Sequence, residues 1–486
     1  MGTFLLWAVV KVAIMVGFLV NVAGLLTWLD RRGGAMMQDR IGPNRAGLPL
    51  PGGKTLRIAG LLHTAADGVK FFTKEDFMPP KADKVLFSLA PMLAMFPVIA
   101  LAAVIPFGET LSPDLVMKKV CFPKEGAAQA FQAFVASAEG KCISPVTKQE
   151  VADAVIRTIW PHALRNGIAP NSVPMQVAPL NVGLLYVFAM AGQGIVGAAI
   201  AGWSSDNKFS LMGALRAASQ MVSYEVTMGL TVIGAMMVYG SIRLEDMAMW
   251  QDQNCWGIFV QPLAFVLFFA SATAEAKRIP FDLPEAESEL VSGYFTEYSG
   301  MKFGMFYFAE YMEVVTSSML IVAIFLGGWY LPFLHRDGIT ISIGATTFFS
   351  MVMPHIWVVI ISVLAFFGKT LVLCWIQHFI RWSLPRFRYD QLMKLGWTVL
   401  LPASLANIFA TGIVWLAIQK GGDSLAAGLK VAADLTQAFV AVSVTGLVGW
   451  AVVGMLKPSS RDEKIIGSSA TLAAAAGGTK EAPMRA

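Results

Sequence analysis

Long apolar windows recur from one end of the chain to the other. An α-helix needs about 20 consecutive apolar residues to cross the hydrocarbon core of a bilayer. Windows of about this length run over residues 3–29, 84–107, 179–202, 214–239, 256–275, 304–330, 351–376, 394–418 and 435–456. The pattern therefore predicts an all-α fold, a polytopic transmembrane helix bundle with nine spans.

The composition agrees with lipid as the main solvent of the surface. Hydrophobic residues make up 56% of the chain and charged residues only 14%, whereas a soluble globular protein carries about 25% charged residues. The first window has neither a basic segment before it nor a small-residue cleavage site after it. We therefore interpret it as a retained span rather than a signal peptide.

Basic residues in the short loops predict the orientation. Most loop Lys and Arg residues lie in 30–83 and 377–393, whereas 241–255 and 331–350 hold only Arg243 and Arg336. Cytoplasmic loops are the ones enriched in Lys and Arg. Five segments are thus expected on the cytoplasmic or matrix side: 30–83, 203–213, 276–303, 377–393 and the tail after 457. The N-terminus is expected on the opposite, periplasmic side.

Two segments interrupt the alternation of spans and short loops. Residues 108–178 form a polar insertion, which is expected to cap the outer face. The tail 457–486 is rich in Ser, Gly, Ala and charge and is expected to be disordered. The predicted organisation is 1–107 with two spans, 108–178, 179–418 with six spans and an acidic loop, 419–456 with an extra span, and the tail.

Cysteines and glycine motifs exclude several cofactor sites. The four cysteines form no C-x-x-C pair, so this chain alone supplies no iron–sulfur cluster or structural zinc. Cys121 and Cys142 lie in the outer insertion and form either a disulfide or two free thiols, and Cys255 could pair there instead. The string Gly192-x-Gly194-x-x-Gly197 lies inside a span rather than between a strand and a helix. It therefore indicates helix packing rather than a dinucleotide site.

Carboxylates at or inside the spans are the main candidates for chemistry. Glu225 lies in an apolar window, and a dense group follows: Glu275, Asp282, Glu285, Glu287, Glu289, Glu297, Glu310 and Glu313, opposed only by Lys277, Arg278 and Lys302. A charge at mid-membrane costs about 2.5–3.5 kcal/mol on insertion scales and usually marks function. Crowded carboxylates exchange protons near neutral pH. The group predicts a proton route.

Structural interpretations of some of these acids remain open. Asp282 and Glu285 have the spacing of a helix-capping pair around Pro284, so they could cap a helix or lie in a solvated loop. Glu285 and Glu289 would then share one helix face. Individual acids could also form structural ion pairs with Arg216 or Arg278.

The basic loop 30–83 contains an amphipathic stretch. Between Leu56 and Phe72, apolar residues recur at helical spacing, with Lys70 and Lys74 on the polar side. Such a helix lies in the plane of the membrane interface. It could anchor the chain to the membrane surface or frame a portal for a lipid-soluble substrate, and periodicity alone favours neither.

Five long motifs resemble one family. They are Arg40–Arg45 (RIGPNR), Ala66–Glu75 (ADGVKFFTKE), Arg216–Val226 (RAASQMVSYEV), Pro280–Phe303 (PFDLPEAESELVSGYFTEYSGMKF) and Leu384–Leu392 (LPRFRYDQL). They strongly resemble the H subunit of respiratory complex I, NADH:quinone oxidoreductase, whose mitochondrial equivalent is NADH dehydrogenase subunit 1. The resemblance covers nearly all of 1–107 and 179–418, that is, eight family spans. The ninth span, the insertion and the tail lie outside it.

The resemblance implies a role in quinone reduction coupled to proton translocation. It implies a quinone substrate and a multi-pass location in the bacterial cell inner membrane, with NADH, flavin and iron–sulfur clusters held by partner subunits. Partners would be the hydrophilic quinone-site subunits and small membrane subunits leading to antiporter-like subunits. The implied quinone-chamber residues are Asp30, Arg31, Arg40, Asp67, Arg386 and Arg388. The implied proton path comprises Glu225, Glu275, Asp282, Glu285, Glu287, Glu289, Glu297 and Glu310, with Glu313 a weaker candidate.

The chain departs from the family pattern at three places. Asp30 stands where Glu is common, His63-Thr64 where Gln-Pro is usual, and Lys277 where Asn is expected. Lys277 adds a cation beside Glu275. Two other functions compete with this one. The first is the membrane subunit of a related hydrogenase or formate hydrogenlyase, which shares the bundle but not a quinone substrate, and the second is a stand-alone ion transporter.

Overall fold

The computed structural model describes most of the predicted bundle. It covers residues 2–40, 42–49, 55–56, 60–110, 174–284, 291–335, 338–343 and 346–420, with a few positions between 432 and 446. The predictions for Cys121, Cys142, Glu285, Glu287 and Glu289 lie outside the described residues. So do those for most of the insertion, for most of the ninth span and for the tail.

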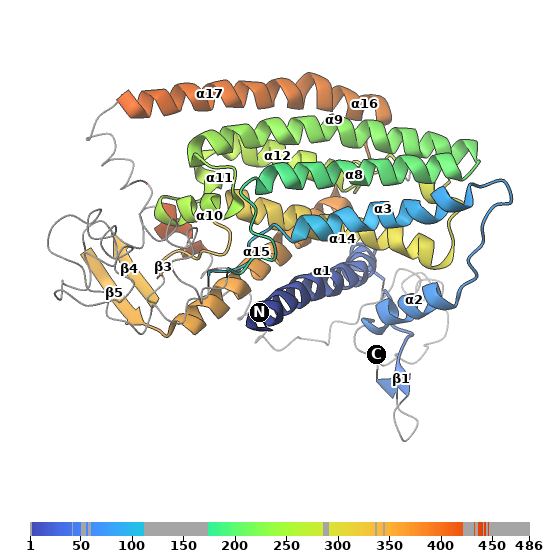
Figure 1. Cartoon of the computed structure of the whole chain (residues 1–486), viewed down its shortest axis with the longest axis horizontal. Coiled ribbons are helices and arrows are strands. Elements are labelled where there is room, and N and C mark those ends of the chain that lie inside the picture. The colour runs from blue at the N-terminus through green and yellow to red at the C-terminus, as the bar shows by residue number, and fades with distance from the viewer. Residues whose placement is uncertain are drawn as a thin grey trace, which may run out of the picture.

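Apolar helices lie side by side along the long axis of the molecule (Figure 1). Within the described residues, seven helices are long and apolar enough to cross a membrane, and one shorter apolar helix joins them. Their bounds are α1 Gly2–Met37, α3 Lys84–Ala102, α8 Gly183–Ser204, α9 Lys208–Tyr239, α12 Pro262–Glu275, α14 Gly300–Phe325, α15 His355–Ser383 and α17 Leu401–Lys420. A short helix, α16 Tyr389–Lys394, leads into α17 through a π-helical turn, Leu395–Leu400. The all-α multi-pass prediction is confirmed.

Several helix ends differ from the apolar windows for local reasons. α1 and α15 continue past the window ends, so Asp30, Arg31 and Arg381 are helical rather than in loops. α9 begins earlier, at Lys208, because the Asn207 side chain accepts the Phe209 N–H at 2.9 Å and caps the helix. The predicted span 256–275 is divided into α11 Gly257–Val260 and α12, because Pro262 starts a new helix.

Small antiparallel sheets lie outside the bundle. β1 Leu48–Pro49 pairs with β2 Thr55–Leu56. At the other end, β3 Leu334–His335, β4 Gly338–Ile343 and β5 Thr346–Val352 form a three-stranded sheet in which Thr340 stands opposite Ser350. β5 takes the first two residues of the predicted span 351–376, so that span begins at His355 instead, after Pro354.

Helix α14 is the centre of the bundle. It is buried over 83% of its most apolar stretch, whereas the other six long helices are buried over 17–56%. It packs against α1, α3, α12 and α15. The amphipathic helix α2 Leu62–Thr73 also rests on it, because Gly304 leaves room for the Phe71 ring. The predicted amphipathic helix is therefore present, starting at Leu62.

Hydrogen bonds between the connecting segments show which of them lie at the same end of the bundle. At one end, Ser299 donates to the Glu75 carbonyl at 3.1 Å, and the Phe387 N–H donates to the Pro280 carbonyl at 3.0 Å. At the other end, the Gln251 amide oxygen accepts the N–H groups of Gly257 and Gly327 at 2.9 and 2.8 Å. Segments 30–83, 276–303 and 377–393 thus share one end, as the charge pattern predicts. Which membrane side each end faces stays a prediction.

Small residues set the distance between α3 and α8. A Cβ at Gly197 would lie 2.8 Å from the Ala94 backbone nitrogen, whereas one at Gly194 would meet only the Met221 methyl at 3.8 Å. The glycines of the G-x-G-x-x-G string therefore differ in importance, and Gly197 is the packing glycine.

We expect Gly197→Ala to destabilise the chain by about 1–3 kcal/mol, because the added methyl must push α3 away. Thermal unfolding of the detergent-purified protein measures this, with Gly194→Ala as the matched control. Equal melting temperatures for both variants would contradict the packing role of Gly197.

Candidate functional site

Asp30 joins several helices at the end of the bundle that carries α2 and α16. Its carboxylate, near the C-terminal end of α1, accepts a hydrogen bond from the Tyr311 hydroxyl at 2.6 Å. It also forms ion pairs with Arg381 of α15 and, at 3.7 Å, with Arg278 after α12. His378 Nε2 lies 3.7 Å from the other carboxylate oxygen. The buried Asp30 charge is therefore neutralised by groups from three other segments.

The remaining predicted quinone-chamber residues lie around this cluster. Arg31 pairs with Asp67 of α2 at 2.5 Å, with both side chains partly exposed. Arg388 is exposed and pairs with Asp390 at 3.5 Å. Arg40, just beyond α1, is also exposed. The structure thus brings Asp30, Arg31 and Asp67 close together, whereas Arg40 and Arg388 are surface groups near the same end.

Asp282 connects this end to the acidic group. Arg386 donates to its carboxylate at 2.8 Å. Burial raises the pKa of Asp282 to about 6, and the charge of Glu310 contributes in the same direction, while Arg386 opposes both. A carboxyl group with a pKa of about 6 can exchange its proton close to physiological pH.

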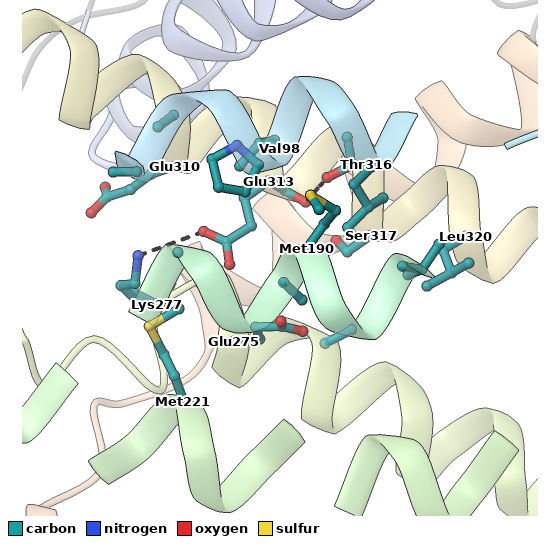
Figure 2. Close-up of a pocket in the computed structure, with 18 of the residues that line it drawn as sticks. Val98, Met190, Met221, Glu275, Lys277, Glu310, Glu313, Thr316, Ser317 and Leu320 are labelled. Carbon is teal, nitrogen blue, oxygen red and sulfur yellow. Dashed lines mark hydrogen bonds and ion pairs between the residues drawn. The ribbon is translucent and has the colours of Figure 1, made fainter. Parts of the chain in front are cut away.

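A cavity of about 50 Å³ lies beyond Asp282, between α3, α8, α9, α12 and α14. Its wall is mostly apolar, with a few convergent polar groups: Glu275, Lys277, Tyr294, Glu310, Glu313, Thr316 and Ser317. All of these except Tyr294 are labelled in Figure 2. A water molecule occupies roughly 15 Å³ on this measure, so about three waters fit if polar groups hold them. The cavity can therefore hold a short hydrogen-bonded chain.

Helix α14 supplies two of the cavity carboxylates. Glu310 is 3% exposed and accepts a hydrogen bond from the Tyr294 hydroxyl at 3.2 Å. Glu313 lies one turn further along the same face of α14. Its carboxylate is 3.6 Å from the Lys277 ammonium.

Five acids in this region influence one another electrostatically in sequence. Asp282 and Glu313 each experience the charge of Glu310. Glu275, at the end of α12, experiences the charges of Glu313 and of Glu225. Glu225 lies on α9 beside Gly192, whose missing side chain leaves room for the carboxylate. The order Asp282, Glu310, Glu313, Glu275, Glu225 runs from the Asp30 end into the bundle.

Glu297 lies apart from this row. It accepts a hydrogen bond from the Asn207 side chain at 2.6 Å and is not among the residues that line the cavity. Its contact ties the segment before α14 to the start of α9.

Sequence reasoning misses several residues of the site. Arg381 and His378 are far from Asp30 in the sequence, although both lie beside its carboxylate in the fold. Tyr294 carries no sequence signal, because its hydroxyl reaches Glu310 only through the fold. Arg216, considered as an ion-pair partner for the acids, has its guanidinium 5.7 Å from the Tyr389 ring centre.

Comparisons with known proteins agree on one family. The family model described as NADH dehydrogenase matches residues 9–134 and 154–412. The first of the H subunits of NADH-quinone oxidoreductase in Cytophaga hutchinsonii is 37% identical over 409 residues, 84% of this chain and 96% of that protein. The protein of the same name from Geobacter metallireducens is 38% identical over 410 residues, with the same two shares.

A third relative extends the comparison. The NADH-quinone oxidoreductase H subunit of Flavobacterium psychrophilum is 37% identical over 390 residues, 80% of this chain and 91% of that protein. The matched region contains the helices that carry Asp30, the cavity and the row of acids. The chain therefore belongs to the NADH dehydrogenase family, as a multi-pass membrane protein similar to the H subunit of NADH-quinone oxidoreductase.

Proposed function

We propose that this chain is the membrane subunit of a proton-pumping NADH:quinone oxidoreductase that forms part of the quinone chamber and starts the proton path. The observation that carries this proposal is the row of five acids leading from Asp282 to Glu225 through a cavity with room for water. The names of the relatives supply the redox partners and the substrate class.

The Asp30 end of the bundle has the features of a quinone chamber wall. Helix α2 has no buried residue, and its Val69 and Phe72 side chains are 64% and 75% exposed. Such a helix suits the membrane interface, where an amphipathic, lipid-soluble substrate arrives. Beside it, Arg31, Asp67 and the Asp30 cluster offer charged and hydrogen-bonding groups to a polar head group. The proposed chain organisation is the one predicted from the sequence: 1–107, 108–178, 179–418, 419–456 and the tail 457–486.

Electrostatic coupling can link quinone reduction to the acids. Moving one proton against 100 mV requires about 2.3 kcal/mol. A unit negative charge about 7 Å away supplies about 2.4 kcal/mol at an effective dielectric constant near 20. Reduction of a quinone near Arg386 would therefore favour proton uptake by Asp282, and the row would pass the proton toward Glu225. Partner subunits deliver the electrons, from NADH through flavin and iron–sulfur clusters.

Substitutions of Glu225 and Glu310 test whether the row of acids carries protons. We expect Glu225→Gln and Glu310→Gln each to lower NADH:quinone turnover at least tenfold, because a neutral amide cannot take up and release a proton. The variants are assayed in native membranes. NADH oxidation by an artificial acceptor that bypasses the quinone is the control for assembly.

Wild-type quinone turnover in both variants would contradict the proton path. Purifying the chain also tests the broader proposal: a hydrogenase subunit or a stand-alone transporter would not copurify with NADH:quinone activity.

A substitution of Asp67 tests whether α2 frames the portal through which quinone enters. Its ion pair with Arg31 is partly exposed and contributes only about 0–1 kcal/mol to stability. We therefore expect Asp67→Asn to raise the apparent KM for quinone several-fold while the enzyme stays assembled.

Asp390, in an exposed pair with Arg388, provides the matched control variant, Asp390→Asn. A proportional loss of quinone and artificial-acceptor activities in Asp67→Asn would indicate misassembly and would argue against the portal.

A further inference from the structure

Lys277 occupies an unusual backbone position at the edge of the cavity. It follows α12 directly, and its φ of 52° lies in the left-handed region. Helices commonly end in this conformation, but usually on a glycine, which has no Cβ to clash. A lysine here keeps a strained backbone, and such strain clusters at functional sites.

The Lys277 side chain is directed into the cavity. Its ammonium lies 3.6 Å from Glu313, and the two side chains are 8% and 17% exposed. Figure 2 shows the ammonium facing the Glu313 carboxylate, with Glu275 and Glu310 on either side. The ammonium also lies 5.8 Å from the centre of the Tyr294 ring, whose hydroxyl donates to Glu310. Lys277 thus pairs with Glu313, and its charge also acts on Glu275.

The charges in the cavity wall are unequal in number. Among the lining residues, Glu275, Glu310 and Glu313 can be negative, and Lys277 is the base that faces them. The neighbouring Arg278 does not line the cavity: it pairs with Asp30 and lies 3.8 Å from the centre of the Tyr311 ring, although its charge also acts on Glu313. Removing Lys277 would leave the three carboxylates without a lysine or arginine among the residues that line the cavity.

We propose that Lys277 is a positioning residue of the proton path. Its ion pair with Glu313 sets the charge of the cavity, so that Glu275 and Glu310 exchange their protons in the working pH range. This inference rests on the proposed function. It adds a residue that controls which carboxylates are ionised.

The ion pair predicts opposite shifts of the pH profile. In Lys277→Asn, the lost positive charge lets the carboxylates hold protons to higher pH, so the profile of NADH:quinone turnover should move up. Glu313 is itself a member of the row, so Glu313→Gln should also lower turnover at least tenfold. The pH profile of its remaining turnover, normalised to its own maximum, should move down because a negative charge is lost. Each shift should be about one pH unit, the effect of a unit charge roughly 10 Å away at an effective dielectric constant near 20.

The double variant and two conservative variants complete the experiment, all in the assembled enzyme. Lys277→Asn/Glu313→Gln should return the normalised profile toward the wild type, because the two charges are removed together, while its turnover stays as low as that of Glu313→Gln. Lys277→Arg keeps the charge and should keep the profile. Lys277→Gly suits the left-handed backbone better than lysine does, so a purely structural role predicts normal behaviour, whereas the proposal requires the same upward shift as Lys277→Asn.

Three outcomes would overturn the inference: unmoved profiles in the single variants, shifts in the same direction, or a double variant no closer to the wild type. The Glu310→Gln enzyme separates this failure from that of the proposed function. If Glu310→Gln loses turnover while Lys277→Asn leaves the profile unmoved, only the role of Lys277 fails. If Glu310→Gln keeps full turnover, the proton path itself fails.

Discussion

A carboxylate inside a membrane helix bundle must be matched by a counter-charge, a hydrogen-bond donor or a proton, because lipid supplies none of these. This chain meets the requirement in two ways. Asp30 is surrounded by Arg278, Arg381 and the Tyr311 hydroxyl, which fixes a charged cluster between α1, α14 and α15. The cavity acids share one lysine among three carboxylates. The first arrangement pairs the Asp30 charge with groups from other helices. The second leaves three carboxylates facing one ammonium, and in the proposed function these carboxylates exchange protons.

Helix α14 connects the two arrangements. Tyr307 and Tyr311 lie one turn apart, with hydroxyls 3.1 Å from each other, and lead to Asp30. Glu310 and Glu313, also one turn apart, lie in the cavity wall on a different face of the helix. Because α14 is the most buried of the long helices, its two faces have fixed positions. In the proposed function, a change of charge at the Asp30 end acts electrostatically on the acids on the other face of α14.

Much of the fold could be predicted from sequence, since apolar length alone defines a membrane helix. Apolar length does not predict helix ends that single residues determine: Asn207 starts α9 early and Pro262 shortens α12. Within the site, Glu225, Glu275 and Glu310 can be identified because charge in an apolar window is conspicuous. The contribution of Tyr294 and the pairing of Lys277 with Glu313 depend on contacts between segments, which no local pattern encodes.

The proposal that protons pass along the five acids is tested most directly at Glu275, because Glu275 lies between Glu313 and Glu225 in the row. The measurement is the number of protons translocated per NADH oxidised by the Glu275→Gln enzyme in sealed vesicles, beside NADH oxidation by an artificial acceptor. Our account predicts loss of quinone-dependent proton translocation with the artificial-acceptor activity preserved. A wild-type proton ratio at the wild-type rate would contradict it.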